Sequence, residues 1–204
     1  QSKLCVWQLQ SLFTYNYGDC RMSILKVQQL QHTNGTVGLD INTSGSVHMP
    51  GHVVQAIYSE TDSRASYTST SFVDVTGMTA TITPKYNTSK ILVQVCMNIG
   101  IQNAAFNLSC TLFRGSTAIF AGTDTSNKQG FVQIEGNTTG GQYKIYNQTA
   151  TVLDAPASSS AVVYKVAGRI NTPAGTWYLN RNHYNWVDQG NTKSSMTLLE
   201  IAQW

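Results

Sequence analysis

The sequence of 204 residues has little charge, little proline and little cysteine, and these shortages exclude several classes of protein. Charged residues make up 11% of the chain, whereas a typical soluble domain has roughly 25%. The net charge of +3 is small and scattered, so we expect no nucleic-acid partner, because such binders carry a clustered basic surface. The apolar runs are far shorter than the ~20 residues of a transmembrane helix, so we expect no membrane span.

Long helices are not expected either, because glycines and Ser-Thr pairs interrupt every apolar segment. The 41% of hydrophobic residues can still build a core, which argues against disorder. Ser, Thr, Asn, Gln and Gly therefore supply an uncharged polar surface. Low charge density favours self-association, so this composition is typical of a protein that assembles, and a secreted monomeric lectin is the alternative.

Short apolar runs separated by turn residues recur from Val53 to the end of the chain, roughly every 8–15 residues, which is the pattern of a β-sandwich or barrel. The segment of about 150 residues is long enough for one all-β, antiparallel sandwich domain, which we assign to residues 53–204. We predict strands near 53–58, 71–75, 78–83, 90–99, 105–113, 117–121, 130–135, 143–147, 150–154, 161–170, 175–181 and 195–202.

The first 52 residues carry a weaker pattern. Val37, Leu39 and Ile41 alternate as in a short strand, but so small a strand pair is marginal by itself in water. We therefore predict that 22–52 form a short-stranded stalk or linker that pairs with sister chains. Residues 1–21 contain several aromatic residues, and we interpret the segment as an extension or anchoring arm. Aromatic side chains exposed on such an arm need a partner surface to cover them.

The four cysteines give no disulfide framework. Cys96 and Cys110 fall in two apolar runs that could be neighbouring strands, and we expect free buried thiols there, with a covalent pair left open. A bond between Cys5 and Cys20 is also left open. No Cys or His spacing is typical of a zinc site, and we expect no cofactor.

Several segments, taken in order, resemble the marine bacteriophage virion structural proteins of the tail-fibre or head-fibre kind. The resemblance covers residues 22–202 and leaves out 1–21. The matching segments are MSILKV at 22–27, VHMPGHVVQ at 47–55, TSFVDVTGM at 70–78, TITPKYNTSKILVQ at 81–94, LFRGS at 112–116 and MTLLEI at 196–201.

This resemblance implies a jelly-roll sandwich like the C1q and tumour-necrosis-factor heads, assembled as a homotrimer on the exterior of a virion. The function implied is a fibre or spike that attaches to a host-surface glycan or protein by repeated weak contacts, while the N-terminal arm binds other virion proteins. The alternatives are a capsid decoration or cement protein that clamps neighbouring shell subunits, a carbohydrate-binding lectin and a tail-associated glycan hydrolase. We expect no enzyme, because the carboxylates are scattered and no catalytic motif occurs.

The densest polar and aromatic segment is 180–190, and it is the first candidate for a receptor site. Aromatic faces stack on sugar C–H groups, and amide, carboxylate and guanidinium groups bind hydroxyls. Alternatively, these aromatic residues belong to a strand and pack on a sister subunit. The candidate ligand-binding residues are Tyr178, Arg181, Asn182, His183, Tyr184, Trp186 and Asp188, and a second candidate in 142–147 consists of Tyr143 and Tyr146.

Two histidines, His48 and His52, flank the Met49-Pro50-Gly51 hinge. In a trimer they could meet near the axis and hold a metal ion, because imidazole is a common metal ligand. Their spacing matches no known ligand pattern on a strand, so we treat them as weak candidates beside a packed or solvated hinge.

Overall fold

The computed structural model describes residues 29–31, 33, 35, 37–41, 47–102, 104–121, 130–136, 140–184 and 192–203. Within these residues the chain is all-β with antiparallel pairing, and its one helical element is the 3-10 turn η1 (Gly141–Tyr143). Contacts divide the chain into two units, residues 1–47 and 48–204, which we describe separately. No helix in the described ranges is long and apolar enough to cross a membrane.

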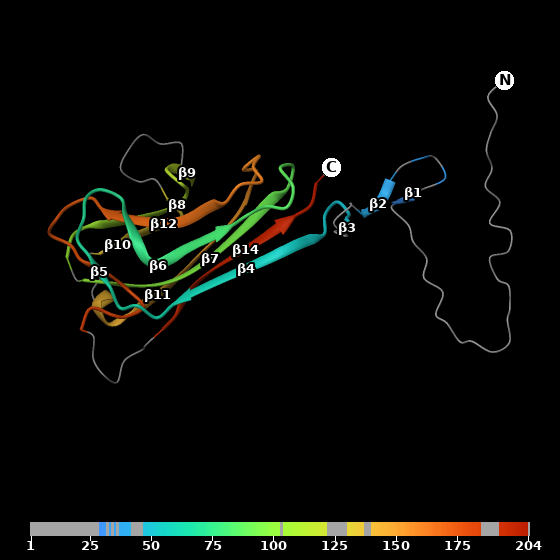
Figure 1. Ribbon diagram of the computed structural model, residues 1–204. Coiled ribbons are helices and arrows are strands. Elements are labelled where there is room, and N and C mark those ends of the chain that lie inside the picture. The colour runs from blue at the N-terminus through green and yellow to red at the C-terminus, as the bar shows by residue number, and fades with distance from the viewer. Residues whose placement is uncertain are drawn as a thin grey trace, which may run out of the picture. The chain divides into compact units, whose positions relative to one another are not determined.

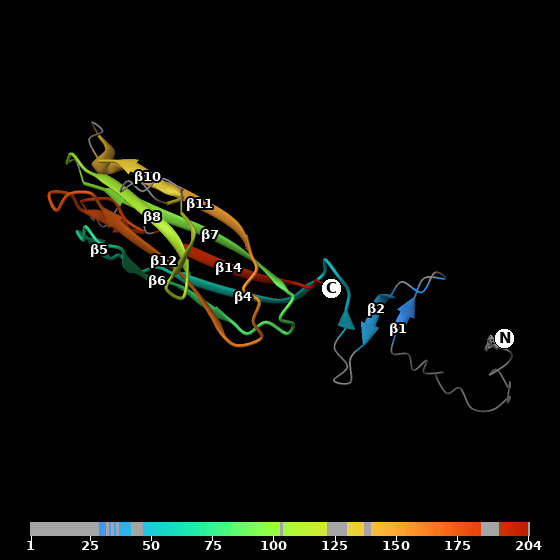
Figure 2. The same cartoon turned by 90° about the horizontal axis from the view of Figure 1, so that it is seen from above.

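Two antiparallel sheets face each other in the larger unit, as in a β-sandwich (Figures 1 and 2). The first sheet has six strands, and five of them follow the order β4-β14-β7-β13-β5. β14 and β13 pair with successive parts of one edge of β7, and β11 pairs with the opposite edge. Its strands are β4 (Val53–Thr61), β5 (Ser66–Tyr67), β7 (Lys90–Ile101), β11 (Ile145–Asp154), β13 (Trp177–Leu179) and β14 (Ser194–Ile201).

The second sheet has five strands in the order β10-β8-β12-β6, with β9 also paired to β8. The chain therefore changes sheet repeatedly, since β6 and β8 lie on either side of β7 in sequence but belong to the opposite layer. The strands of this sheet are β6 (Val73–Ile82), β8 (Asn107–Arg114), β9 (Thr117–Phe120), β10 (Val132–Glu135) and β12 (Val162–Ile170).

The core fills the space between the two sheets. Side chains alternate across each strand, so every second residue of β7, from Ile91 to Ile101, is buried. The second sheet contributes residues such as Met78, Leu108 and Tyr164 to the same cluster. Burial of each large apolar side chain stabilises the fold by about 1.5–3 kcal/mol.

The smaller unit contributes three short strands, β1 (Gln29–Gln31), β2 (Val37–Ile41) and β3 (Val47–His48), which pair in the order β1-β2-β3. All three residues of β1 are exposed, and the side chain of Leu30 is 54% accessible. This sheet buries little apolar surface of its own. The predicted arm at 1–21 lies outside the described residues.

Two strand predictions were wrong in the same way, because a supposed turn lies inside one continuous strand. Segments 71–75 and 78–83 form the single strand β6, where Gly77 has φ +75° and the pairing with β12 shifts register as in a β-bulge. Segments 143–147 and 150–154 form β11, whose polar residues pair with β7 without interruption. Polar residues were mistaken for turns because one face of β11 is solvated.

The prediction for the cysteines needs a correction as well. Both Cys96 and Cys110 are free thiols, but their strands, β7 and β8, belong to opposite sheets. Cys110 is fully buried between the sheets, and this burial raises its pKa. Cys96 lies on the outer face of its sheet and is only half-buried. Cys5 and Cys20 fall outside the described residues.

Candidate functional site

Four aromatic side chains and one arginine gather at the end of β13 and beside η1. Tyr178 is on β13, while Arg181, His183 and Tyr184 follow it in the connecting loop, and Tyr143 comes from η1. We call these five residues the aromatic cluster. The cluster unites residues of the first and second candidate sites, which lie about 40 positions apart in the sequence and meet only because the chain folds.

Asn180 fixes the course of the loop that carries the cluster. Its backbone adopts the left-handed conformation, with φ 57°, which Asn tolerates better than most residues. The buried Asn180 side-chain amide donates to the carbonyls of Thr61 (2.9 Å) and Ser63 (3.1 Å), and its oxygen accepts from the hydroxyl of Ser194 (2.6 Å). Two separate segments, the end of β4 and the start of β14, are therefore tied to the residue that begins the loop.

Arg181 has a structural role within the cluster. Its guanidinium carbon lies 4.0 Å from the centre of the Tyr178 ring, a cation–π contact. Its Nη1 donates to the carbonyls of Asn182 (3.1 Å) and His183 (3.2 Å), and its Nε donates to that of Arg64 (3.3 Å). Burial lowers the pKa of Arg181, and the charge of Arg64 adds to that effect.

The tyrosines of the cluster differ in exposure. Tyr178 is buried, its hydroxyl is 2.7 Å from Nδ1 of His183, and burial raises its pKa. Tyr143 and Tyr184 stack with ring centres 5.1 Å apart and remain 49% and 41% exposed. Their mutual hydrogen bond raises the pKa of Tyr184. His183 contacts the edge of the Tyr184 ring, and its backbone N–H donates to the carbonyl of Gln142 (3.2 Å).

The two other predicted site residues that the structure describes, Tyr146 and Asn182, do not join the cluster. Tyr146 points inward from β11 and packs against the core, so it does not belong to a surface site. Asn182 is buried, at 2% exposure, and so serves the loop rather than a ligand. Trp186 and Asp188 are outside the described residues. The residue that the sequence analysis missed is Asn180, whose signal was an Asn directly after a short strand.

The histidine pair at the hinge stays a prediction, because only one of its two side chains is described. His52 is half-buried, and its Nδ1 is in contact with the carbonyl oxygen of Met49. The side chain of His48 is not among those described. No group of three His, Cys, Asp or Glu side chains comes together where the structure describes the chain.

A second surface feature is the outer face of the six-stranded sheet, across β11, β7, β14 and β4. The strand registers align the outward residues of these strands in rows, and we call three adjacent rows in the middle the neutral sheet face. The rows are Leu153-Leu92-Leu199-Ala56, Thr151-Gln94-Thr197-Tyr58 and Thr149-Cys96-Ser195-Glu60. Only Glu60, at one corner, is charged, and it is paired with Lys193.

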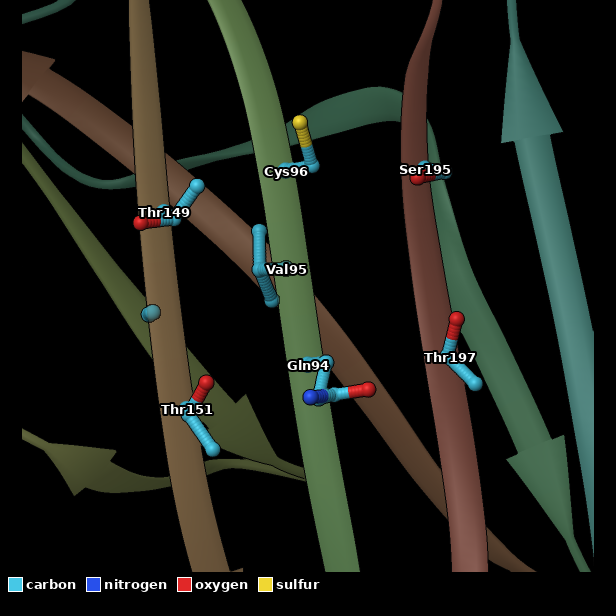
Figure 3. Close-up of a pocket in the computed structure, with 8 residues that line it drawn as sticks. Gln94, Val95, Cys96, Thr149, Thr151, Ser195 and Thr197 are labelled. Carbon is cyan, nitrogen blue, oxygen red and sulfur yellow. The ribbon is translucent and has the colours of Figure 1, made fainter.

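The middle of this face is slightly hollow. A depression of about 260 Å³ lies over the small side chains of Thr149, Thr151, Cys96, Ser195 and Thr197 (Figure 3). One of the three rows, the one that contains Leu153, is apolar, and Leu153 is 53% exposed. The surface thus offers small uncharged side chains beside an apolar row, and its one charged residue, Glu60, lies at a corner.

The outer face of the opposite sheet is different in character. Asp74 of β6 and Lys165 of β12 form an ion pair at 2.9 Å. Arg169 of β12 lies over the Phe72 ring, 4.9 Å from its centre. The ion pair of this face joins two neighbouring strands, whereas that of the other face, Glu60–Lys193, lies at the corner of the neutral sheet face.

Comparison with known proteins adds no relative to this description. No protein-family model matches the sequence, and no curated protein is significantly similar to it.

Proposed function

We propose that this protein is a bacteriophage virion structural protein, a homotrimeric fibre or spike exposed on the virion exterior. The larger unit is the head of each subunit, and the aromatic cluster is its attachment site for a host-surface glycan or protein. The protein acts by binding, without chemistry. The resemblance of residues 22–202 to tail-fibre and head-fibre proteins gives this proposal its biological setting.

The neutral sheet face is the observation that carries the proposal. A monomeric domain normally keeps charge on a solvated sheet, whereas this face leaves three rows of one sheet almost without charge. Leu153 and Tyr58 are 53% and 63% exposed on the same face, and exposing such large hydrophobic side chains to water is unfavourable. A second copy of the chain can cover such a surface without desolvating an ion.

The arrangement of the long strands supports the jelly-roll interpretation. β4, β14, β7 and β11 form one four-stranded block, and β6, β12, β8 and β10 form the other. The first and last strands of the domain are paired to each other, and most connections pass from one layer to the other. Two Greek keys closed into a double sheet have this organisation.

The proposal is tested by the mass of the full chain in solution. Light scattering at micromolar concentration should give three times the 22.3 kDa of one chain. Gln94→Glu combined with Thr151→Glu places two carboxylates on the neutral sheet face and should shift the mass toward one chain, because each buried charge loses its hydration.

The matched control is Thr79→Glu combined with Thr81→Glu, which adds the same charges at exposed positions of β6 on the opposite face. The control should remain trimeric, and circular dichroism should show that both variants are folded. A wild-type mass of one chain across the micromolar range overturns the trimer and, with it, the fibre.

A carbohydrate-binding lectin is the second candidate, and the exposed Tyr143 and Tyr184 pair favours it. A lectin and a fibre differ in assembly rather than in the site. A monomer that binds sugar is a lectin, whereas a trimer that binds the host surface is a fibre.

A further inference from the structure

The stacked pair of Tyr143 and Tyr184 is a surface without an assigned ligand class. From its geometry we infer that the aromatic cluster binds a neutral saccharide and discriminates against acidic ones. This inference rests on the proposed attachment function and adds the chemistry of the receptor.

The platform itself has the dimensions and exposure that a sugar ring needs. The two rings are 25° from parallel and are stacked, so each turns one face toward the other. With 49% of Tyr143 exposed, a large part of its ring remains available to the C–H surface of a pyranose. Two half-exposed rings are too small a patch for a protein interface, which needs about 800 Å² from each partner.

The rings are also held in place before any ligand arrives. The hydrogen bond between their side chains links Tyr143 to Tyr184, and Gln142 hydrogen-bonds Tyr184 as well. His183 supports Tyr184 from the side, with ring centres 4.8 Å apart. A preorganised platform avoids the ordering cost that weakens most small contacts.

The preference for a neutral ligand follows from the state of Arg181. An acidic sugar is normally held by a guanidinium that offers two parallel N–H groups to the carboxylate. Here Nη1 and Nε of Arg181 donate to three backbone carbonyls, and the plane of the group lies against Tyr178. Arg181 could meet a carboxylate in this way only by giving up contacts that shape the loop.

The hydroxyl groups of Tyr143 and Tyr184 suit the same ligand class. A hydroxyl both donates and accepts, which matches the hydroxyl groups of a sugar. Arg64, whose carbonyl accepts a hydrogen bond from Nε of Arg181, and Lys144, which directly follows Tyr143, are exposed cations beside the cluster. Their side chains are therefore the ones to test as alternative anchors for an acidic sugar.

The test uses the full chain and a printed panel of neutral oligosaccharides of glucose, galactose and N-acetylglucosamine beside uronic-acid and sialylated oligosaccharides. We expect at least one neutral member to bind, with the acidic members at least tenfold weaker. Titration with the best neutral oligosaccharide should show at least a tenfold loss of affinity for Tyr143→Ala. Phe120→Ala, which removes a 40% exposed aromatic side chain from β9 of the opposite sheet, is the control and should bind normally.

Two further variants separate the neutral from the acidic ligand. Arg64→Gln and Lys144→Gln should leave the affinity for the neutral oligosaccharide unchanged. A preference for acidic members that is lost in either variant overturns the inference, as does a panel with no binding at all. Light scattering on the same samples distinguishes the two proposals, because a trimer that binds no saccharide refutes this inference alone, and a monomer that binds one refutes the trimer alone.

Discussion

At the scale of single residues, one polar trio joins the two sheets inside the sandwich. Tyr164 of β12 is completely buried, and its hydroxyl donates to Oδ2 of Asp154 on β11 at 2.7 Å. Nη1 of Arg114 on β8 donates to both carboxylate oxygens of Asp154 at 2.9 Å. The carboxylate of one sheet is therefore satisfied by two donors from the other, as burial of a charge requires.

This trio predicts a dependence of stability on alkaline pH. Burial, and then the hydrogen bond to Asp154, raise the pKa of Tyr164 above its unfolded value of about 10. The folded state therefore holds this proton more tightly. Its contribution is complete below pH ~10 and declines as the pH rises beyond that value, by at most about 1.4 kcal/mol per pH unit.

Tyr164→Phe should lower the free energy of unfolding by about 1.5–3 kcal/mol at pH 7, because a hydrogen bond to a charged group is lost. The difference between wild type and variant should then shrink above pH 10, measured by urea unfolding at pH 7, 9, 10 and 11. A difference that stays constant over this range contradicts the assignment. Burial also raises the pKa of Cys110, and this effect is common to both proteins and cancels in the comparison.

The sequence predicted which kinds of residue the candidate site contains, but not all of the residues that lie side by side in it. Tyr178, Arg181, His183 and Tyr184 lie in one short segment, so their proximity could be read from the chain. Tyr143 joins them because β11 and β13 both pair with β7 near its end. Asn182 and Tyr146 have suitable chemistry but point inward, which residue type alone does not reveal.

At the scale of elements, β6 shows how one glycine lets a strand continue where its sequence suggests a turn. Gly77 has φ +75°, which L-residues rarely adopt. A Cβ at this position would lie 2.4 Å from Oγ1 of Thr61 on β4. The glycine therefore satisfies both a backbone requirement and a close approach between the two sheets.

Gly77→Ala should lower the free energy of unfolding by about 2–5 kcal/mol, since the left-handed conformation costs about 1–2 kcal/mol and overpacking adds about 1–3 kcal/mol. Denaturant unfolding measures the loss. Gly115→Ala is the matched control, because Gly115 also has a positive φ, +58°, but has no atom within 4 Å of the added Cβ. If both variants lose the same free energy of unfolding, the close approach of Gly77 to Thr61 does not contribute to stability.

At the scale of the whole molecule, the two faces of the sandwich have different chemical character. One is crossed by the Asp74–Lys165 ion pair, and the other is the neutral sheet face with Cys96 near its middle. Cys96 accepts a contact from the side-chain amide of Asn147 at 3.2 Å and is otherwise half-open. Its thiol therefore reports whether this face is covered.

We expect Cys96 to react slowly with iodoacetamide in the proposed trimer and at least tenfold faster in the Gln94→Glu, Thr151→Glu variant. Peptide mass spectrometry separates its labelling from that of the other cysteines. Added carboxylates disfavour the thiolate, so a faster reaction can only come from uncovering the face. Cys110, which is fully buried, should remain unlabelled in both folded proteins. Equal rates at Cys96 would place the subunit interface elsewhere or remove it.

The sequence by itself determined the all-β class and most strand positions, because apolar residues at every second position and turn residues between them are local signals. It also placed the polar, aromatic segment after the strand that contains Tyr178. Only the tertiary structure decided which strands share a sheet, that Cys96 and Cys110 face different environments, and that Tyr143 stacks on Tyr184. Those outcomes depend on pairing between distant segments, and the free energy that selects a pairing comes from burying both faces of the core together, which no short stretch of sequence contains.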